Sequence, residues 1–438
     1  MPDTDSFAIE QLGPCKLNNP LTEKQYFRFR EDDEKIPLNP VYRNTPSEGS
    51  MELAGARRKI YFQPGRTRAA IVTCGGLCPG INAVIRGIVM QLWHIYGCKD
   101  IIGIRYGFGG LTENAPPPIE LNPTIVNDLK TRGGTILGTS RGTPPTDQLV
   151  DSLEWKNIDI LFVIGGDGSM RGANAIWEEV KKRGLKKSII GVPKTIDNDI
   201  PFVTRSFGFE TAVAEACEAV NCASTEARGI RNGIGIVKLM GRNAGYIAAN
   251  ACLASGNANF CLIPEVAFAL DGPGGFLDLL ERRLRLRHNA VIVIAEGAGQ
   301  EFFADQDLGS DASGNRKLGD IGLLLKERIS TYLKKVGLDN SIKYIEPSYL
   351  IRSTGPNAND QLFCDTCARA AVHAALAGKS GLLIGNRFRH IVHVPMRALA
   401  GKERKVNPDG DLWFSVRENT GQPQYIGTQA SSEQAEES

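Results

Sequence analysis

The sequence predicts an α/β protein built on doubly wound, mainly parallel sheets. Short β-branched apolar runs alternate along the chain with longer, helix-like segments. The runs are apolar throughout, a pattern typical of strands whose two faces are both covered by helices. The alternation extends over about 330 residues, a length that favours more than one sheet.

Eight runs are expected to form strands, namely Ala69–Thr73, Ile101–Ile104, Ile158–Ile164, Ser188–Val192, Ile234–Leu239, Phe260–Ile263, Ala290–Ile294 and Leu382–Ile384. Open parallel sheets bind their ligands beyond the carboxyl ends of the strands. The residues that follow each run are therefore the candidates for function.

The bulk composition excludes several classes of protein. The chain has 438 residues and a net charge of +2, without the basic patch that nucleic-acid or membrane-surface binding needs. Its first residues do not have the pattern of a secretory signal and no apolar stretch is long enough to cross a membrane, so we expect neither. Its ten cysteines are expected to be reduced thiols of a cytoplasmic protein. Cys364 and Cys367 form a lone CxxC in an apolar stretch, which favours burial over metal binding.

The two ends of the chain differ from its centre. Residues 1–65 carry mixed charge, several prolines and little periodicity. We expect them to form an extension that packs outside the core or on a neighbouring subunit. Residues 396–438 are assigned to a C-terminal tail, which is polar from residue 403 onward and is expected to fray.

A glycine-rich turn follows the first predicted strand. Residues 74–80 read CGGLCPG, and a helix is expected to start near Asn82. Free backbone N–H groups at the start of a helix cradle phosphate, although glycine also serves to fit a helix against a strand. The turn is not a Walker A loop, which needs the pattern GxxxxGK[ST].

A second turn, GGDGS at residues 165–169, follows the strand that ends at Ile164, and helix propensity resumes from Met170. Its three glycines let the backbone approach a ligand while Asp167 faces the same space. A carboxylate beside a phosphate suits Mg²⁺, which keeps several waters and few protein ligands. An N-cap aspartate is the alternative, but three glycines exceed what a cap requires.

A third turn, PKTIDND at residues 193–199, follows the next strand. Asp197 and Asp199 lie two residues apart on a segment expected to be extended, so they should point the same way. One can act as a general base on a hydroxyl while the other orients a substrate or metal. Lys194 and Thr195 can donate to a transferring phosphoryl group. A simple turn would explain the asparagine and aspartates but not the preceding Lys-Thr.

Two further turns, GTSRG at 138–142 and MGRNAG at 240–245, each hold one arginine between glycines. Arginine offers a fixed charge and a bidentate fork to phosphate oxygens. Glu296 follows a later strand, and Tyr349 and Arg352 come after another. Together these loops indicate a phosphoryl-transfer enzyme.

The motifs GGLCPGINAVIRG, GTSRG, GGDGS, PKTIDND, KLMGRNAGYIA and PSYLIRS resemble those of the phosphofructokinases in order and spacing. The resemblance covers roughly residues 66–395. GGDG alone also occurs in NAD and lipid kinases, whereas TIDND and MGR downstream of it do not. The residues within these motifs are most similar to those of the long clade of plant, trypanosomatid and some bacterial enzymes.

The resemblance implies two similar α/β lobes with the active site between them. The nucleotide-binding lobe would hold residues 66–209 with 352–395, and the sugar-phosphate-binding lobe residues 210–351. A site shared across an interface would make the protein a homo-oligomer, with a tetramer favoured. The allosteric sites of the short enzymes cannot be traced in this chain.

Roles for single residues also follow from the resemblance. Asp197 would be the base for the 1-hydroxyl of fructose 6-phosphate, supported by Asp199, while Asp167 would hold Mg²⁺. The catalytic set would be Asp197, Thr195, Arg242 and Lys194. The nucleotide would lie against Gly76, Arg141, Gly168, Ser169 and Gly172. The sugar phosphate would lie against Thr195, Asp197, Asp199, Met240, Gly241, Arg242, Glu296, Lys343, Tyr349 and Arg352.

Three positions depart from the short enzymes. These have histidine where Tyr349 stands and arginine where Lys343 stands, yet both replacements can donate to a phosphate. They also reach the 6-phosphate across the subunit boundary with an arginine where this chain has Gly233. Glycine cannot do this, and Arg228 or Arg231 could substitute for it.

The phosphoryl donor is the main choice that the sequence leaves open. Pyrophosphate-dependent relatives carry GGDD, whose extra aspartate would repel the α-phosphate of ATP at a cost of the order of several kcal/mol. Here that position is Gly168, which favours ATP, whereas Lys194 is shared with the pyrophosphate users. The resulting prediction is an ATP-dependent phosphofructokinase.

Two alternatives remain, a pyrophosphate-dependent enzyme and a non-catalytic relative that binds sugar phosphate. The intact Asp167, Asp197, Asp199 and Arg242 argue against the second. A dehydrogenase is disfavoured because no GxGxxG with an acidic residue about 20 positions on follows a strand.

Overall fold

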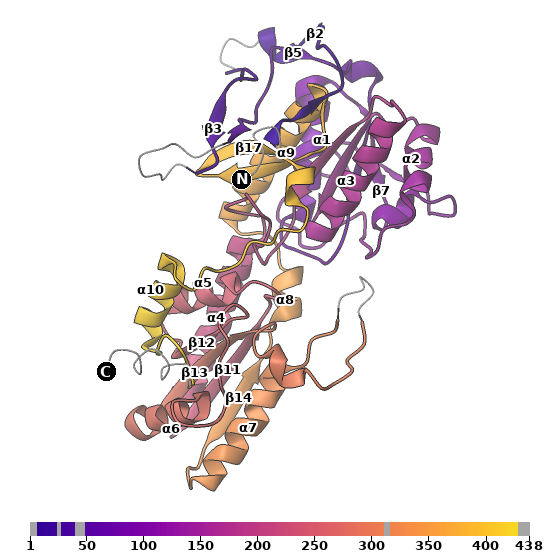
Figure 1. The fold of residues 1–438 in the computed structure, drawn as a ribbon. Coiled ribbons are helices and arrows are strands. Elements are labelled where there is room, and N and C mark those ends of the chain that lie inside the picture. Colours follow the sequence, from indigo (N-terminus) through magenta and orange to yellow (C-terminus); the bar gives the residue numbers. More distant parts are fainter. Residues whose placement is uncertain (1–6, 24–27, 40–48, 311–315, 428–438) are drawn as a thin grey trace. The chain divides into compact units, whose positions relative to one another are not determined.

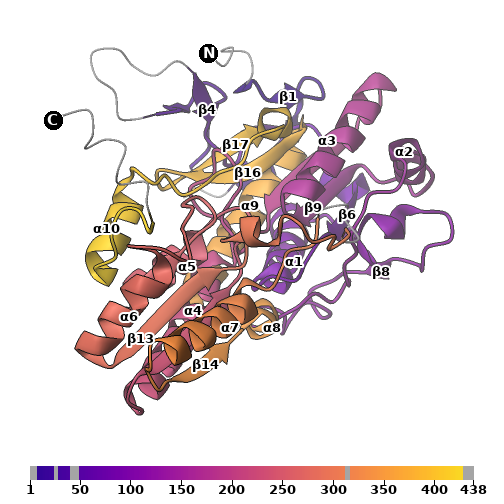
Figure 2. The ribbon, with the colours of Figure 1, turned by 60° about the horizontal axis from the view of Figure 1, so that its bottom comes forward.

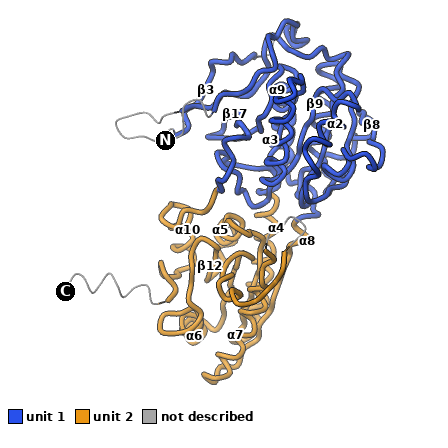
Figure 3. The backbone as a smooth tube through the Cα atoms, turned by 45° about the vertical axis from the view of Figure 1, so that its right-hand side comes forward, with its two compact units in different colours: residues 1–210, 352–403 blue, residues 211–351, 404–438 orange. Residues whose placement is uncertain are grey.

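A computed structural model describes residues 7–23, 28–39, 49–310 and 316–427. The chain divides into two compact units (Figure 3). Unit 1 consists of residues 1–210 and 352–403, and unit 2 of residues 211–351 and 404–438. The chain thus passes from one unit to the other three times, and each unit is described by itself.

Unit 1 is built on a seven-stranded sheet with the order β17-β16-β10-β9-β6-β7-β8. Five strands are parallel: β6 (Arg68–Thr73), β7 (Asp100–Ile104), β9 (Ile160–Gly165), β10 (Ser188–Pro193) and β16 (Leu382–Arg387). The two edge strands, β8 (Ile119–Glu120) and β17 (His390–Pro395), are antiparallel. The parallel centre is the apolar part of the sheet, as its sequence predicts.

Helices cover both faces of this sheet (Figures 1 and 2). On one face α1 (Ile81–Met90) packs against α9 (Ala358–Leu376). On the other face α2 (Thr146–Trp155) packs against α3 (Asp167–Lys182). The helices and strands enclose an apolar core that includes Val72, Leu161, Val163, Ile176 and Leu383.

Unit 2 is built on a four-stranded parallel sheet with the order β12-β13-β11-β14. Its strands are β11 (Gly233–Leu239), β12 (Phe260–Leu262), β13 (Asn289–Ala295) and β14 (Ser341–Ile345). Its helices are α5 (Tyr246–Ser255), α6 (Phe276–Arg287), α7 (Ile321–Lys335) and α10 (Asp411–Thr420). Two helices contain the points where the units join, α4 (Phe209–Arg228) and α8 (Ser348–Ser353).

Short elements complete the description. The 3₁₀ turns are Pro20–Glu23, Pro64–Arg66, Gly107–Leu111, Gln300–Phe303 and Met396–Leu399, and a π-helical turn, Gln91–Tyr96, continues α1. Among the described residues, no helix combines the length and the apolarity needed to cross a membrane.

The α/β fold with mainly parallel sheets is confirmed, and each of the eight predicted runs contains a strand. The eight runs leave out β14, the strand expected before Tyr349, because the alternation of polar and apolar residues in SIKYI hides an edge strand that is only half-buried. It also placed the start of α3 at Met170, whereas the helix begins at Asp167. Gly166, with extended backbone, ends the strand and lets the helix start at once.

The N-terminal extension packs on unit 1 through short strand pairs. β1 (Glu10–Gln11) pairs with β15 (Lys379–Ser380). Within the extension β2 (Leu17–Asn18) pairs with β5 (Lys59–Ile60), and β3 (Lys35–Pro37) with β4 (Ser50–Glu52). Residues 1–6, 24–27 and 40–48 of this segment lie outside the described residues.

The expectation of a frayed tail is wrong for residues 404–427. They form α10, which packs against α5, and they bury Trp413, Val416 and Ile426. The stretch is polar on average, but these apolar side chains are spaced so that one face of it is buried. Residues 428–438, which include the whole of the final QASSEQAEES, lie outside the described residues.

Candidate active site

The three central strands of unit 1 end at the same level, which brings their loops together. Thr73 of β6 and Val192 of β10 are both register partners of Ile164 of β9. Beyond the ladder, the N–H of Cys74 donates to the carbonyl of Ile164 (2.9 Å), and the N–H of Lys194 donates to that of Gly165 (2.9 Å). The turns at 74–80, 165–169 and 193–199 therefore share one edge of the sheet.

The glycine turn after β6 is held by the GTSRG turn. The N–H of Gly75 donates to the carbonyl of Ser140 (3.0 Å), and the Thr139 hydroxyl donates to the carbonyl of Gly75 (2.6 Å). Gly75 has φ +83°, and a side chain at Gly76 would meet no atom within 4 Å. These contacts place Arg141 next to a glycine turn that faces open space.

The GGDGS turn opens α3 directly. A Cβ at Gly165 would lie 2.2 Å from that of Ser169, so this position requires glycine. The first N–H groups of a helix have no acceptor within it and carry the positive end of its dipole. Asp167, Gly168 and Ser169 all lie in this first turn. One turn further on, Gly172 lets α3 approach the ring of Phe108 and the hydroxyl of Thr143.

Asp167 lies in a partly buried, partly negative environment. Its carboxylate pairs with Arg171 one turn along the helix. Burial raises the pKa of Asp167 above its usual value and Asp199 adds to this rise, while Arg171 opposes it. Two carboxylates close enough to repel each other are a donor set that a divalent cation satisfies. Among the described residues no cluster of three or more metal-ligating side chains occurs.

Lys194 is buried at the centre of the three turns. Its ammonium donates to the carbonyl of Gly76 (2.7 Å), and a Cβ at Gly75 would lie 3.6 Å from it. Burial lowers the pKa of Lys194, and Asp197 opposes that shift while Arg352 adds to it. Asp197 and Arg352 thus lie close enough to Lys194 to affect its pKa. Lys194 therefore ties the glycine turn to the PKTIDND turn.

The PKTIDND segment is a turn, so the expectation that it is extended is wrong. The chain bends at 196–197, and Asn198 adopts a left-handed conformation with φ +55°. Its side-chain amide donates to the carbonyl of Thr204 (3.1 Å) and accepts from the N–H of Ser206 (3.0 Å). Asn198 thus has the turn-forming role that its residue type favours, and it fixes the residues on either side.

Thr195 links the two aspartates of this turn. Its hydroxyl donates to the carboxylate of Asp199 (2.9 Å) and accepts from the N–H of Asp197 (3.1 Å). The Ser206 hydroxyl in turn donates to the Thr195 carbonyl (2.6 Å). The aspartates therefore have different surroundings, since Asp199 is held by a hydroxyl within the turn.

The remaining candidates follow strands of unit 2. After β11 come Met240, Gly241 and Arg242, and after β13 comes Glu296. The N–H of Glu296 donates to the carbonyl of Leu239 (2.8 Å), so the two loops start side by side. Met240 is buried, which leaves its backbone as the part that can meet a ligand.

The backbones of these two loops are in close contact. The N–H of Gly297 donates to the carbonyl of Gly241 (3.1 Å), and a Cβ at Gly297 would lie 1.9 Å from the carbonyl oxygen of Arg242. Gly241 itself has φ +125°. The Arg242 guanidinium donates to the carbonyl of Arg316. Both glycines are therefore needed for the path of the chain.

Lys343 and Tyr349 are exposed side chains of unit 2. Lys343 is in β14 opposite Gly235, and Tyr349 in α8 is 84% exposed. The structure thus gathers the predicted residues into two groups. One is on unit 1, and the other, with Met240, Glu296, Lys343 and Tyr349, is on unit 2. An active site between the lobes stays a prediction.

Sequence reasoning missed several residues that support these loops. Arg171 pairs with Asp167, and the Ser206 hydroxyl donates to the carbonyl of Thr195. Only Arg171 had a readable signal, an arginine four residues after an aspartate at the start of a helix. The CxxC cysteines, Cys364 and Cys367, are buried free thiols in α9.

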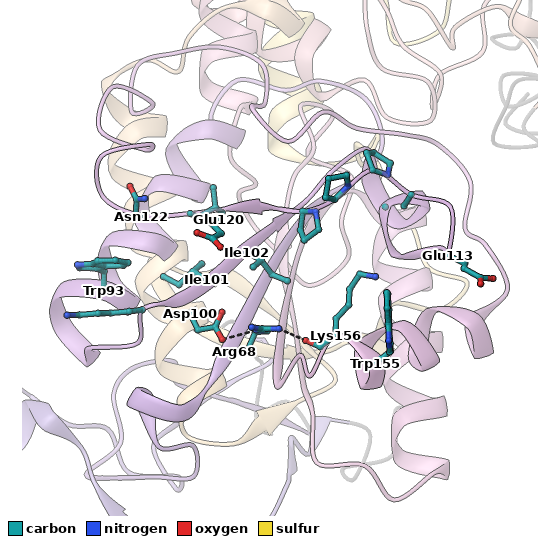
Figure 4. Close-up of a pocket in the computed structure, with 17 residues that line it drawn as sticks. Arg68, Trp93, Asp100, Ile101, Ile102, Glu113, Glu120, Asn122, Trp155 and Lys156 are labelled. Atoms are coloured by element: carbon teal, nitrogen blue, oxygen red, sulfur yellow. Dashed lines mark hydrogen bonds and ion pairs between the residues drawn. The ribbon is translucent and has the colours of Figure 1, made fainter.

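A pocket of about 780 Å³ lies elsewhere in unit 1 (Figure 4). Trp93 and Trp155 stand on opposite sides of it, and Arg68 pairs with Asp100 (2.8 Å) in its floor. Arg68 and Asp100 are the first residues of β6 and β7, so the pocket is at the amino ends of the strands. It contains none of the predicted site residues. The candidate active site is therefore assigned to the loops at the carboxyl ends of the strands, which hold those residues.

The fold and the loops define a class: a doubly wound α/β enzyme whose strand ends are equipped for phosphoryl transfer. A family model described as Phosphofructokinase matches residues 68–375. The chain belongs to the phosphofructokinase family.

Similar proteins span almost the whole chain. The "ATP-dependent 6-phosphofructokinase" of Borreliella burgdorferi is 48% identical over 433 residues, which cover 95% of this chain and 97% of that protein. The protein of the same name from Trypanosoma brucei brucei is 44% identical, covering 95% and 87%. "ATP-dependent 6-phosphofructokinase 7" of Arabidopsis thaliana is 44% identical, covering 94% and 85%. The relatives thus include the plant and trypanosomatid enzymes that the motifs resemble.

Solved structures share the fold. The pyrophosphate-dependent phosphofructokinase from Marinobacter aquaeolei superimposes with a TM-score of 0.67 at 22% identity, covering 82% of this chain and 92% of that one. Pichia pastoris phosphofructokinase in the T-state gives 0.62 at 22% identity, covering 88% and 41%. At these identities the likeness concerns the fold alone.

Proposed function

We propose that this chain transfers the γ-phosphoryl group of ATP to the 1-hydroxyl of fructose 6-phosphate, giving fructose 1,6-bisphosphate. The observation that carries the proposal is the convergence of the glycine, GGDGS and PKTIDND turns at one edge of a parallel sheet. Relatives named ATP-dependent 6-phosphofructokinase at 44–48% identity support the choice of donor.

The GGDGS turn and the glycine turn form the donor end. Phosphates would lie against the N-terminus of α3 and the turn around Gly76, with Arg141 beside it. A Cβ at Gly168 would meet nothing nearer than the Arg171 guanidinium at 3.6 Å, so this position has room facing the donor. Ser169 lies in the same first turn, and Gly172 keeps α3 close to the 139–143 segment.

The PKTIDND turn forms the chemical end. Asp197 would take the proton of the sugar 1-hydroxyl as the oxygen bonds to the γ-phosphorus and the bond to the leaving ADP oxygen breaks. Thr195, which positions both aspartates, would contact the transferred group. Arg242 and Lys194 would offset the charge on that group.

Mg²⁺ fits the donor end. The charge of Asp199 adds to the rise in the pKa of Asp167, and one or two carboxylates with phosphate oxygens are the ligand set that Mg²⁺ uses. When bound, the ion would neutralise charge between the β- and γ-phosphates. Asp167 would hold it, with Asp199 oriented by Thr195 nearby.

Unit 2 would bind the sugar phosphate. Glu296 and the backbone at Met240 and Gly241 suit sugar hydroxyls, whereas Lys343 and Tyr349, with Arg352 of unit 1, suit the 6-phosphate. Side chains that donate hydrogen bonds are suited to an anionic ligand. We also propose a cytoplasmic homo-oligomer, with a tetramer favoured.

A donor comparison tests the proposal. Purified protein would be supplied with fructose 6-phosphate, Mg²⁺ and either ATP or pyrophosphate, and the bisphosphate would be followed with a coupled aldolase assay. We expect turnover with ATP. Turnover with pyrophosphate alone would overturn the choice of donor and favour the alternative that Lys194 suggests.

The same assay separates an enzyme from a non-catalytic sugar-phosphate-binding relative. Asp197→Asn keeps the size of the side chain but removes the base, so turnover should fall by roughly a hundredfold or more. Equal background rates for wild type and variant, with fructose 6-phosphate still bound, would favour the binding protein.

A further inference from the structure

Lys238 lies at the end of the unit 2 sheet, one residue beyond the last pair of the ladder between β11 and β14. The ladder between β11 and β14 ends with the pair Val237 and Ile345. The next residue on each strand is charged: Lys238 on one and Glu346 on the other. Their side chains meet, with the Lys238 ammonium 3.1 Å from a carboxylate oxygen of Glu346. An ion pair therefore continues the connection where the backbone hydrogen bonds stop.

A third element joins at the same ammonium. Lys238 lies 2.9 Å from the carboxylate of Asp320, the N-cap residue of α7. Asp320 also accepts from the N–H of Leu323 (3.1 Å), and the Tyr344 hydroxyl lies 3.2 Å from both Asp320 and Glu346. One buried cation thus binds the ends of two strands and the start of a helix.

The charge state of this cluster is fixed by its contacts. The Lys238 side chain is only 10% exposed, and burial by itself lowers a lysine pKa. The hydrogen bonds that Lys238 donates to Asp320, Tyr344 and Glu346 outweigh burial, so the pKa of Lys238 lies above its usual value. The ammonium is therefore charged at neutral pH, and its removal would leave two carboxylates facing each other.

Both segments that leave the cluster carry predicted ligand-binding residues. Lys238 is two residues before Met240 and four before Arg242. On the other side, Glu346 accepts from the hydroxyl of Ser348 (3.4 Å), the first residue of α8, which carries Tyr349. The cluster touches no predicted ligand residue itself, but it sets the spacing of the segments that hold them.

We propose that Lys238 is a positioning residue for the sugar-phosphate side of the site, acting through Glu346 and Asp320. The inference rests on the proposed function, because the ligand assigned to Met240, Arg242 and Tyr349 is fructose 6-phosphate. Replacing Lys238 should therefore change the spacing between the segment that holds Met240 and Arg242 and the segment that holds Tyr349. The turns of unit 1 should keep their spacing.

The test compares Lys238→Met with Lys238→Arg. For the Met variant we expect KM for fructose 6-phosphate to rise roughly tenfold or more, since small misplacements cost up to about a hundredfold. KM for ATP should stay within about twofold, because its predicted contacts are in unit 1. Lys238→Arg keeps a cation and should recover most of the loss. Arg328→Met, which breaks an ion pair with Asp271 in the same unit, is the matched control and should change neither constant.

Several outcomes would overturn the inference. An unchanged KM for fructose 6-phosphate, or an equal rise in both KM values, would show that Lys238 is only structural or irrelevant. If Lys238→Met does not fold, Glu346→Gln is judged by the same split. In a variant that carries both Lys238→Met and Glu346→Gln, the two effects on KM for fructose 6-phosphate should be less than additive, because both substitutions remove the same contact. Failure of the proposed function is seen separately, as a wild type that does not phosphorylate fructose 6-phosphate.

Discussion

At the residue scale, the proposed choice of ATP as donor is linked to the absence of a side chain at Gly168. Gly168 lies in the first turn of α3, beside Asp167, and its Cβ position is open. A Cβ at this position would meet only the Arg171 guanidinium, at the ordinary contact distance of 3.6 Å.

We predict that Gly168→Asp lowers kcat/KM for ATP by on the order of a hundredfold or more, because like charges in a partly desolvated site cost several kcal/mol. Steady-state kinetics at saturating fructose 6-phosphate would measure it. Gly168→Asn, which has the same size without the charge, separates bulk from repulsion. Unchanged ATP kinetics in the aspartate variant would refute the exclusion of ATP at this position.

At the element scale, the N-terminal extension is attached to unit 1 by a buried charge cluster. Glu52 of β4 accepts from Lys379 of β15 (2.8 Å), from His393 of β17 (3.0 Å) and from Arg57. Arg57 and Lys379 also pair with Asp32. The extension is therefore part of the folded unit.

This cluster predicts a pH dependence of stability. Burial raises the pKa of Glu52, but the bonds from His393 and Lys379 outweigh it and hold the pKa at about 2, against 4.5 for the free side chain. A carboxyl group whose pKa is lowered by folding stabilises the fold at pH values above its pKa in the unfolded chain, here by about 3 kcal/mol. This stabilisation is lost as the pH falls from 4.5 towards 2.

We predict that Glu52→Gln removes this acid-dependent stability and lowers the free energy of unfolding at neutral pH by about 3 kcal/mol, because buried cations lose their partner. Urea unfolding between pH 2 and 7 would measure both effects. Glu178→Gln, at an exposed carboxylate of α3, is the control and should leave the pH profile unchanged. A profile for Glu52→Gln that matches the wild type would contradict the prediction.

The C-terminal helix is a second element whose role only the structure revealed. α10 packs on α5, and the side chain of Gln422 completes the edge of β12. It accepts from the N–H of Cys261 (2.7 Å) and donates to its carbonyl (3.1 Å). A covered edge protects a sheet from pairing with other chains, so the tail should stabilise unit 2.

We predict that Trp413→Ala destabilises the protein by about 3–5 kcal/mol, since this side chain is 2% exposed within α10. The neighbouring Phe414, 54% exposed, gives the control. Phe414→Ala should change stability by about 0.5 kcal/mol or less. Equal effects for the two variants in urea unfolding would show that α10 does not pack as described.

At the scale of the whole molecule, neither unit is a continuous piece of chain. Unit 1 is completed by residues 352–403 and unit 2 by residues 404–438. A net charge of +2 gives no general attraction for anionic substrates, so the positive charge must be local, as at Arg141, Lys194 and Arg242.

We predict that the protein in solution is an oligomer, with a mass about four times that of the 47.5 kDa chain. A sugar-phosphate site shared across a subunit interface, which the resemblance to the phosphofructokinases implies, requires at least a dimer. Light scattering coupled to size-exclusion chromatography would measure the mass. A monomer with full activity would refute the sharing of the site.

The sequence by itself determined the class of fold, the central strands and the positions of the three loops of unit 1 that hold the candidate residues. It could do so because buried parallel strands are continuously apolar and because ligands of such sheets bind at the loops beyond the carboxyl ends of the strands. The tertiary structure decided what depends on contacts between distant segments. It showed that Asn198 makes PKTIDND a turn, that Trp413 anchors the tail, and that Lys238 joins Asp320 and Glu346. A lysine among polar residues gives no sign of its partners, because these lie far along the chain and meet it only after folding.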